Sequence, residues 1–433
     1  MNARIKVLEA VGQLGLGGTE YALQLYSKYL DKQRFDVKVV ALYRGGERVK
    51  QVEELGIEVF IIENNFDLLE KLVQDIDVIH WHGSGIPDEP FFRIIQKNKP
   101  KLVIQTNVFG WYSKDSAFNH LIDFDLYISK MILVRRMQLD QNLEPSKRKF
   151  LSYPVDVDFL LENAPSENDI LSFRNEYSLN HQFLVGRIGR ASDSKFDLIT
   201  FDGFKEFLKY QPDSCFILVG ATDLMIAYIN YLGIAKNVRI LPNTIELKRL
   251  LVYYSAMDTF IAASSIGESF GMVMAEAMTM GTPVLTIHTP KRDNAQIELV
   301  ENMQTGIVVP RLKKNIALGL KEINENPLLA EKFSQNSITK VKREFDAHKV
   351  VESLQNLIFK ELGQEQSVVN SILYDWNTDM ADEYEAKCLD LYGGLNSLGK
   401  FKIKIFDTFI YQIVRKIFLK IIVYIYNKNI KGY

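Results

Sequence analysis

The chain has 433 residues, enough for two or three domains, and its 47% hydrophobic and 24% charged residues are typical of folded globular proteins. With 52 basic and 54 acidic residues the net charge is −2, which excludes a nucleic-acid binder that acts through overall positive charge. Two cysteines, Cys215 and Cys388, cannot form a disulfide framework or a four-ligand zinc site and suit a reducing compartment. Because no signal-peptide pattern follows Met1 and no run of 18 residues is free of charge, we expect a cytoplasmic protein without a spanning helix.

Short apolar runs alternate with amphipathic ones in the first 160 residues. The apolar runs predict strands at residues 5–8, 37–42, 59–62, 78–80, 102–105 and 126–129. The amphipathic runs predict helices at residues 20–30, 49–55 and 66–73. This alternation is typical of a parallel sheet covered by helices on both faces. Residues 153–159 and the polar stretch 162–169 interrupt it and predict an inter-domain linker.

The same alternation starts again at residue 183. Strands are predicted at residues 183–188, 216–219, 238–241, 259–262 and 283–287, and helices at 198–208, 245–255 and 270–280. Helical patterns continue over residues 327–362. We therefore predict an α/β protein with two doubly wound domains, in which ligands bind beyond the carboxyl ends of the strands.

A glycine-rich turn lies between the first strand and the first helix, from Gly12 to Glu20. Glycines let the backbone approach a ligand, and the start of the following helix attracts anions. The spacing of Gly12, Gly15 and Gly17 does not match the dinucleotide fingerprint G-x-G-x-x-G. A tight turn that binds no ligand is the alternative interpretation.

Two cations, Arg190 and Lys195, follow the first strand of the second domain. At the carboxyl end of a strand they can close on a diphosphate from two sides, Arg190 with its planar fork and Lys195 as a point charge. Solvated surface charges are the alternative interpretation of this pair.

The most informative segment, residues 264–284, runs through a Gly/Ser loop into the helix predicted from residue 270. A helix start leaves the N–H groups of Phe270, Gly271 and Met272 available to an anion. Glu268 lies in the loop and Glu276 in the second helical turn, and helical side chains lean back toward the N-terminus, so both carboxylates can face one ligand. An anion site flanked by carboxylates suits a nucleotide sugar.

Four stretches together resemble family 4 of the retaining glycosyltransferases: Gly17-Gly18-Thr19-Glu20, Gly189-Arg190 to Lys195, the Glu-x7-Glu segment Glu268 to Glu276 closing in Gly281-Thr-Pro-Val, and Gln304-Thr-Gly306-Ile-Val308. That family has the glycosyltransferase B fold of two facing Rossmann-like domains. Over residues 1–362 the resemblance implies an acceptor-side domain at 1–160, a nucleotide-sugar-binding domain at 161–345 and a helix crossing back at 346–362. Residues 363–433 would form a helical extension.

The resemblance also implies roles for individual residues. Arg190 and Lys195 would hold the donor diphosphate, Glu276 the ribose hydroxyls, and Glu268 would face the transferred sugar. Glu268, Arg190 and Lys195 are therefore the predicted catalytic residues. Further donor contacts are predicted at Gly17, Gly18, Ser269, Phe270, Gly271 and Met272.

The first domain departs from the family in one loop. Members often carry a histidine after the Thr of the fifth strand, but this chain has Val108 two residues after Thr106, so that catalytic assignment has no counterpart here. His82 and Asn107, at two predicted strand ends, are the acceptor-side candidates, although a strand-end histidine is as often structural. Asp156 resembles the family's linker motif.

A retaining glycosyltransferase is the main hypothesis, moving a sugar from a UDP- or GDP-sugar to a hydroxyl acceptor. No metal and no other cofactor is expected, because fixed cations and helix N–H groups stabilise the leaving diphosphate and three Asp-x-Asp triplets only bracket strands or a linker. From the resemblance, attack would occur on the leaving-group face, with the diphosphate accepting the proton. The alternatives are a nucleotide-sugar epimerase or phosphorylase of the same fold and an inactive subunit that chaperones an active transferase.

The last segment begins at Lys400, closes on Tyr433 and carries a charge of +7, which leaves −9 for residues 1–399. A helical projection gathers apolar side chains on one face, Phe406, Ile410, Ile413, Val414, Ile417 and Ile421, and polar ones on the other, Thr408, Gln412, Arg415, Lys416 and Lys420. We expect this segment to lie on an anionic membrane at the inner face of the plasma membrane, with a lipid-linked acceptor of surface polysaccharide synthesis. A helix packed on its own domain, or on a partner such as a second copy, is the alternative.

Overall fold

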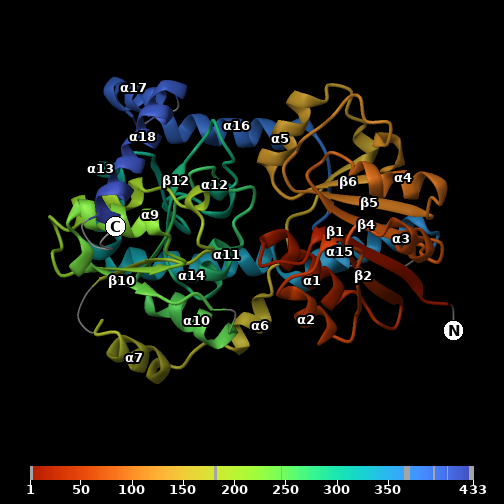
Figure 1. Cartoon of the computed structure of the whole chain (residues 1–433), viewed down its shortest axis with the longest axis horizontal. Coiled ribbons are helices and arrows are strands. Elements are labelled where there is room, and N and C mark those ends of the chain that lie inside the picture. Colours follow the sequence, from red (N-terminus) through yellow and green to blue (C-terminus); the bar gives the residue numbers. More distant parts are fainter. Residues whose placement is uncertain are drawn as a thin grey trace. The chain divides into compact units, whose positions relative to one another are not determined.

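The computed structural model describes residues 3–179, 183–244, 246–364, 371–393, 395–406 and 408–428. The chain divides into two compact units: unit 1 is Met1–Asp156 with Arg343–Tyr384, and unit 2 is Val157–Lys342 with Glu385–Tyr433. Each unit has its own largely parallel sheet with helices packed on it (Figure 1). The predicted α/β architecture of two doubly wound domains with a helical C-terminal part is confirmed.

Unit 1 is built on an eight-stranded sheet in the order β14-β7-β6-β5-β4-β1-β2-β3. Its strands are β1 (Ile5–Gln13), β2 (Phe35–Arg44), β3 (Glu58–Ile61), β4 (Val78–Gly83), β5 (Leu102–Asn107), β6 (Phe124–Tyr127), β7 (Arg148–Phe150) and β14 (Tyr374–Asp375). Among the strands in the described part of unit 1, only β14 runs antiparallel to its neighbour. The sequence predicts the first six strands but neither β7 nor β14, which are too short to carry a hydrophobic period.

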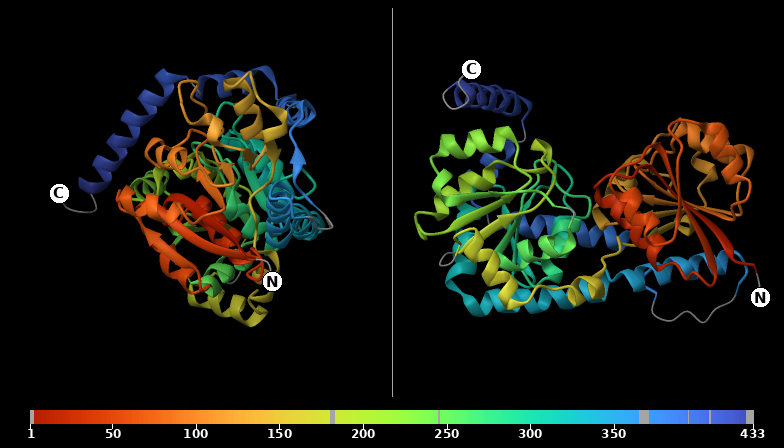
Figure 2. Two further views of the ribbon diagram at one scale, coloured as in Figure 1. Left: turned by 90° about the vertical axis from the view of Figure 1, so that its right-hand side faces the viewer. Right: turned by 60° about the horizontal axis from the view of Figure 1, so that its bottom comes forward.

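Helices cover both faces of the unit 1 sheet (Figure 2). They include α1 (Gly18–Tyr29), α2 (Arg48–Glu53), α3 (Phe66–Val73), α4 (Glu89–Lys97), α5 (Lys130–Leu139) and α15 (Ala347–Glu361). Successive strand residues point to opposite faces, so Ala10 of β1 packs in a core with Phe91 of α4, whereas Val11 packs in another with Leu23 of α1.

Unit 2 is built on a six-stranded parallel sheet in the order β10-β9-β8-β11-β12-β13. The strands are β8 (Leu184–Arg187), β9 (Cys215–Val219), β10 (Val238–Leu241), β11 (Thr259–Ala262), β12 (Val284–His288) and β13 (Gly306–Pro310). The strand order reverses between β8 and β11, and in doubly wound sheets ligands bind at the carboxyl ends of strands at such a switch point.

The helices of unit 2 pack an aromatic core against its sheet. Phe201, Phe204 and Phe207 of α8 lie in one cluster with Phe216 of β9. The helices are α6 (Val157–Glu162), α7 (Glu167–Glu176), α8 (Ile199–Phe207), α9 (Asp223–Leu232), α10 (Leu247–Ala256), α11 (Met272–Thr279), α12 (Gln296–Leu299), α13 (Lys313–Glu325), α14 (Pro327–Glu344) and α16 (Thr378–Gly393). The last two begin in one unit and end in the other.

The C-terminal tail forms two helices, α17 (Ser397–Phe406) and α18 (Phe409–Tyr426), rather than one. Thr408 caps α18 by accepting a hydrogen bond from the N–H of Tyr411, so the chain turns there. The projection that places Phe406 on the apolar face of one continuous helix is therefore wrong, because Phe406 belongs to α17.

One side of α18 packs on unit 2, with Ile422 buried in the core and Leu419, Val423 and Tyr426 partly buried beside it. The placement of Arg415 on an exposed polar face is also wrong, because its guanidinium reaches inward to the buried carboxylate of Asp197.

Two charges of the predicted tail, Asp407 and Lys431, lie outside the described residues. Within the described ranges, none of the helices combines the length and the hydropathy needed to cross a membrane.

Candidate active site

Two loops of unit 2 meet at the switch point of its sheet: the β8 loop, residues 188–198, and the β11 loop, residues 263–271. Strands β8 and β11 are parallel neighbours, so their carboxyl ends lie at the same edge. The loops are joined by hydrogen bonds, from the N–H of Asp197 to the carbonyl of Ala263 at 2.8 Å and from the hydroxyl of Ser265 to the carbonyl of Ser194 at 2.5 Å. The predicted donor-binding residues of this unit therefore gather at one edge.

Arg187, the last residue of β8, fixes the β8 loop through hydrogen bonds from its side chain to carbonyl groups of the loop. Its buried guanidinium donates to the carbonyl oxygens of Val219 at 3.1 Å, of Lys195 at 3.3 Å and of Arg190 at 3.4 Å. Burial lowers the pKa of Arg187 to about 10, although the nearby charge of Glu268 acts in the opposite direction. Arg187 gives no functional signal in the sequence, because it lies inside an apolar strand pattern.

Gly220, which follows β9, lets that strand end close against the β8 loop. Its φ is +80°, and a Cβ there would lie 1.9 Å from the carbonyl oxygen of Gly189. Any side chain would thus push the loop away from the strand end, so this glycine fixes where the loop begins.

Lys195 and Glu268 come together across the two loops. The Nζ atom of Lys195 lies 3.2 Å from the Oε2 atom of Glu268, and their side chains are 33% and 22% exposed. Arg190 lies on the same loop with an exposed side chain, and nothing in the described part of the chain hydrogen-bonds to its guanidinium. The structure therefore brings together two of the three predicted catalytic side chains and leaves the third at the surface of the same loop.

Glu268 is held by its backbone as well as by the pair of its carboxylate with Lys195. Its carbonyl accepts from the N–H of Ala295 at 2.8 Å, and its own N–H donates to the side chain of Gln296 at 3.3 Å. The preceding Gly267 has a φ of +78°, and a Cβ there would lie 1.6 Å from the carbonyl oxygen of Asp293. The segment after β12 thus fixes the backbone of the β11 loop. These contacts do not use the Glu268 carboxylate, which can therefore face a ligand.

Helix α11 begins at Met272, two residues later than the sequence predicts, because Gly271 takes a left-handed conformation as its N-cap. Phe270 and Met272 are buried, and Ser269 is half-buried. The start of α11 is therefore a tight, largely buried turn of the backbone at the end of the β11 loop. Its first N–H groups lack intrahelical partners, as at the start of any α-helix.

Glu276 lies on the second turn of α11 and is half-buried. Its Oε2 atom accepts a hydrogen bond from the hydroxyl of Tyr254 at 2.7 Å. Tyr254 belongs to α10, so that helix fixes the direction of the carboxylate. The tyrosine gives no signal in the sequence, because it reads there as an apolar helix position.

The remaining predicted residues, Gly17, Gly18, His82 and Asn107, belong to unit 1. Gly17 is the N-cap of α1 and Gly18 its first residue, and a Cβ at Gly17 would clash with the carboxylate of Glu20. Asn107 is buried, with its side chain accepting from the N–H of Gly110 at 2.7 Å. Both sites have a clear structural use, and their contact with substrates stays a prediction.

His82 belongs to a buried cluster with Glu9 and His80 on neighbouring strands β1 and β4. His82 Nε2 lies 2.7 Å and His80 Nδ1 3.1 Å from the Glu9 carboxylate, while His80 Nε2 lies 2.7 Å from the hydroxyl of Thr106. Burial alone would raise the pKa of Glu9, but the two histidines lower it to about 2. Burial lowers the pKa of His82 to about 4.

This cluster is also the one group among the described residues whose ligand atoms lie close enough to hold a metal ion, all within 4.8 Å of one another. His80 Nδ1 and His82 Nε2 hydrogen-bond to the Glu9 carboxylate inside the cluster, whereas the buried Nδ1 atom of His82 has no hydrogen-bond partner among the described residues. Glu9 could not be predicted as part of this cluster, because a lone glutamate in a strand gives no spacing signal.

The three Asp-x-Asp triplets, at residues 75–77, 123–125 and 156–158, have partners within their own units. Asp125 is buried in the sheet. The groups that bind these carboxylates are the side-chain amides of Gln105 and Asn107 for Asp125, Lys28 for Asp156 and Lys101 for Asp77. The interpretation of the triplets as structural therefore has a contact for one aspartate of each.

Part of the chain matches a known protein family and a characterised relative. Residues 183–340 match the family model of glycosyl transferases group 1. The alpha-monoglucosyldiacylglycerol synthase of Acholeplasma laidlawii is 28% identical over 188 residues, 41% of this chain and 42% of that protein. The match thus spans less than half the length of this curated relative.

Two solved structures are similar over most of the chain. A glycosyltransferase from Rickettsia africae has a TM-score of 0.72 at 16% identity and covers 84% of this chain and 100% of its own. HepE of Anabaena, in complex with UDP-glucose, has a TM-score of 0.69 at 18% identity and covers 82% of this chain and 100% of its own. The chain has the glycosyltransferase B fold, and together with the family match this supports a glycosyltransferase.

Proposed function

We propose that the protein is a retaining glycosyltransferase of family 4, which moves a sugar from a nucleoside diphosphate sugar to a hydroxyl acceptor. The observation that carries this proposal is the meeting of Lys195 and Glu268 at the switch point of unit 2, beside the start of α11. A cation and a helix N-terminus suit a diphosphate, and a carboxylate suits sugar hydroxyls. The complex of HepE with UDP-glucose supports a UDP-sugar as the donor.

The departing diphosphate is the difficult charge in this reaction. Lys195, Arg190 and the N–H groups at the start of α11 would stabilise it more in the transition state than in the bound substrate, which lowers the barrier. Glu276, held by Tyr254, would bind the ribose hydroxyls. These fixed groups perform the task of a metal ion, so we propose that turnover needs none.

The test of this proposal is nucleotide binding followed by turnover. UDP and GDP are titrated calorimetrically, and Lys195→Ala should weaken binding whereas Lys236→Ala, which removes the same charge from an exposed position of unit 2, should not. In turnover, loss of one such charge should cost about 2 to 4 kcal/mol of transition-state stabilisation, roughly thirtyfold to a thousandfold in rate. Unchanged binding and rate in Lys195→Ala would refute the site.

The reaction type is tested by the products. Retention predicts that the anomeric configuration of the donor sugar survives in the product, which NMR shows directly. A nucleotide-sugar epimerase would convert the donor without any acceptor, so donor incubated alone separates the two functions. Activity that EDTA abolishes and manganese restores would contradict metal independence.

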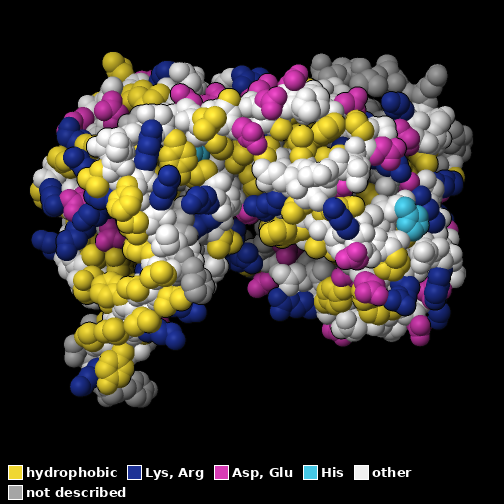
Figure 3. Space-filling model, turned by 90° about the horizontal axis from the view of Figure 1, so that it is seen from above, with side chains coloured by type: hydrophobic (Ala, Val, Ile, Leu, Met, Phe, Trp, Pro, Cys, Tyr) yellow, Lys and Arg dark blue, Asp and Glu magenta, His cyan; other side chains and the backbone are white. Residues whose placement is uncertain are grey.

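We further propose that the tail docks on an anionic membrane and that the acceptor is lipid-linked. The outward side of α18 exposes a row of large apolar side chains, and Figure 3 shows them on the projecting helix at the lower left. The exposed residues are Ile410, Ile413, Val414, Ile417, Phe418, Ile421, Tyr424 and Ile425, together with Leu398 and Phe401 of α17. An apolar row of this size on a folded protein marks an interaction surface.

The charges around this row favour a lipid bilayer as the occupant. Six exposed lysines accompany it: Lys400, Lys402, Lys404, Lys416, Lys420 and Lys428. No acidic residue occurs among the described residues from 395 onward. At about 1 kcal/mol per lysine near an anionic surface, these charges and the apolar row would give binding near −8 kcal/mol, or roughly micromolar. The curated relative is named for a glucosyl-diacylglycerol product, which supports a lipid acceptor.

Cosedimentation with vesicles of graded phosphatidylglycerol content tests the tail. The double variant Ile417→Asp, Ile421→Asp changes two exposed positions and should lose most of its vesicle binding without unfolding. Leu328→Asp on α14 is the matched control, because Leu328 is 79% exposed on the same unit. Equal binding of the double variant and the control, or binding indifferent to lipid charge, would contradict membrane docking.

A further inference from the structure

Asp197, at the end of the β8 loop, joins the candidate donor site to the C-terminal tail. Its side chain is fully buried and accepts hydrogen bonds from the N–H of Ile199 at 3.2 Å, from Arg311 and from Arg415 of α18 at 3.1 Å. Burial alone would raise the pKa of Asp197, but the two guanidinium groups lower it to about 2. The carboxylate therefore stays charged and depends on both arginines.

The connection from Asp197 to the donor site is short. The N–H of Asp197 donates to the carbonyl of Ala263, the first residue of the β11 loop. Lys195 lies only two residues before Asp197. Lys195 in turn pairs with Glu268. A shift of the Asp197 backbone would thus move Lys195, the residue predicted to bind the diphosphate, and loosen the contact between the two loops.

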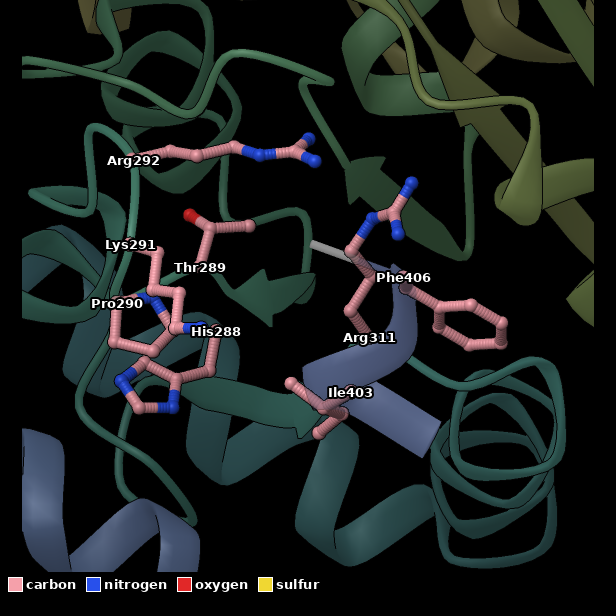
Figure 4. Close-up of a pocket in the computed structure, with 8 residues that line it drawn as sticks. All are labelled: His288, Thr289, Pro290, Lys291, Arg292, Arg311, Ile403 and Phe406. Carbon is pink, nitrogen blue, oxygen red and sulfur yellow. The ribbon is translucent and has the colours of Figure 1, made fainter. Parts of the chain in front are cut away.

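Helix α17 reinforces the same group of residues. The ring of Phe406 lies over the Arg311 guanidinium, with 5.9 Å between ring centroid and Cζ, and Figure 4 shows the two side by side in a pocket that Ile403 also lines. Arg292 lines this pocket as well and donates to the carbonyl of Ser265 in the β11 loop. The tail therefore contacts Arg311, which holds the β8 loop through Asp197, and lines a pocket together with Arg292, which holds the β11 loop.

We propose that Arg415 is a positioning residue for the donor site: through Asp197 it fixes the β8 loop and with it Lys195. The tail is then part of the scaffold that shapes the nucleotide-sugar site, in addition to any surface it offers outward. This inference rests on the proposed function for its consequence, the binding of a nucleotide, but its structural part stands on the Arg415–Asp197 contact alone.

Hydrogen exchange in the full chain, without nucleotide or lipid, tests the structural part. In Arg415→Ala the amides of residues 188–199 should exchange about tenfold faster or more, because a buried carboxylate that loses a partner destabilises its surroundings. Arg415→Lys keeps the charge without the planar fork and should restore part of the protection. Lys314→Ala removes an equal charge from an exposed position of α13 and should leave the loop unchanged.

UDP titration of the same variants tests the consequence. Arg415→Ala should bind UDP several-fold more weakly than the wild type, with Arg415→Lys in between and Lys314→Ala unchanged. Unaltered exchange of residues 188–199 in Arg415→Ala would overturn the inference, as would faster exchange combined with unaltered UDP affinity. If the wild type bound no nucleotide, the proposed function would fail, whereas the exchange experiment would still decide whether Arg415 holds the loop.

Discussion

Glu268→Gln should bind UDP more tightly than the wild type while turning over more slowly. Lys195 Nζ and Glu268 Oε2 are 3.2 Å apart in the structure, so a diphosphate that approaches Lys195 must compete with this carboxylate. In water two unit charges at that distance attract each other by roughly 1 kcal/mol, and measured values for partly exposed pairs reach about the same size. Glutamine keeps the shape and removes the competing charge, which should strengthen UDP binding by about fivefold.

Calorimetric titration of UDP at low and high ionic strength measures this effect. The gain should shrink as salt screens the pair, since both side chains reach solvent. Glu325→Gln, which breaks the exposed pair with Lys321, is the control and should leave UDP affinity unchanged. UDP binding by Glu268→Gln that is equal to or weaker than that of the wild type would refute the reasoning that Glu268 and the diphosphate share Lys195.

Three further predictions concern single side chains. Burial lowers the pKa of His288 to about 4, so folding stability should be lost as pH falls from 6.5 toward 4. In urea unfolding at pH 5, His288→Phe should recover about 2 kcal/mol of this stability. The control variant His120→Phe, at an exposed position, should recover none. Glu9→Gln should cost roughly 3 kcal/mol of unfolding free energy at pH 7, because the folded state lowers the Glu9 pKa from 4.5 to about 2; a cost below 1 kcal/mol would contradict the charged form. Tyr254→Phe should weaken UDP binding by about threefold to tenfold by releasing Glu276, and unchanged affinity would remove Glu276 from the nucleotide site.

The alternation of apolar and amphipathic runs predicted six of the eight strands of unit 1 and five of the six strands of unit 2, and it missed β13. Its other errors lie where the local pattern is weak: β7 and β14 are three and two residues long, and Gly271 delays α11 by taking the left-handed conformation. A glycine of that kind looks the same in the sequence as one that permits close approach to a ligand. Element boundaries at functional turns were therefore less predictable than the elements themselves.

The site was predictable only where a residue type suggests a ligand. Lys195, Glu268 and Glu276 stand out because they lie in or just after turns that contain glycine and serine and that follow predicted strands. Arg187 and Tyr254 support them through contacts between elements far apart in the sequence, and such contacts leave no periodic signal.

The tail shows the same limit. The period of 3.6 residues separates the two faces of the helix, but it does not indicate which face packs on the protein. The helical projection assigns Arg415 to the polar face together with Lys416 and Lys420. The inward direction of Arg415 depends on Asp197, and no local pattern announces a buried carboxylate 218 residues earlier.

That separation also sets an order of events during synthesis. A ribosome adds about 5 to 20 residues per second, so Arg415 is made on the order of ten to forty seconds after Asp197. Most of unit 2 can collapse in that interval with a buried carboxylate that has only Arg311 beside it. A chain that stalls before α18, or is cut there by a protease, would keep its parallel sheet and yet leave Asp197, beneath the nucleotide loop, with only one of its two guanidinium partners. Helix α18 thus completes the electrostatics of a site whose other parts were made long before.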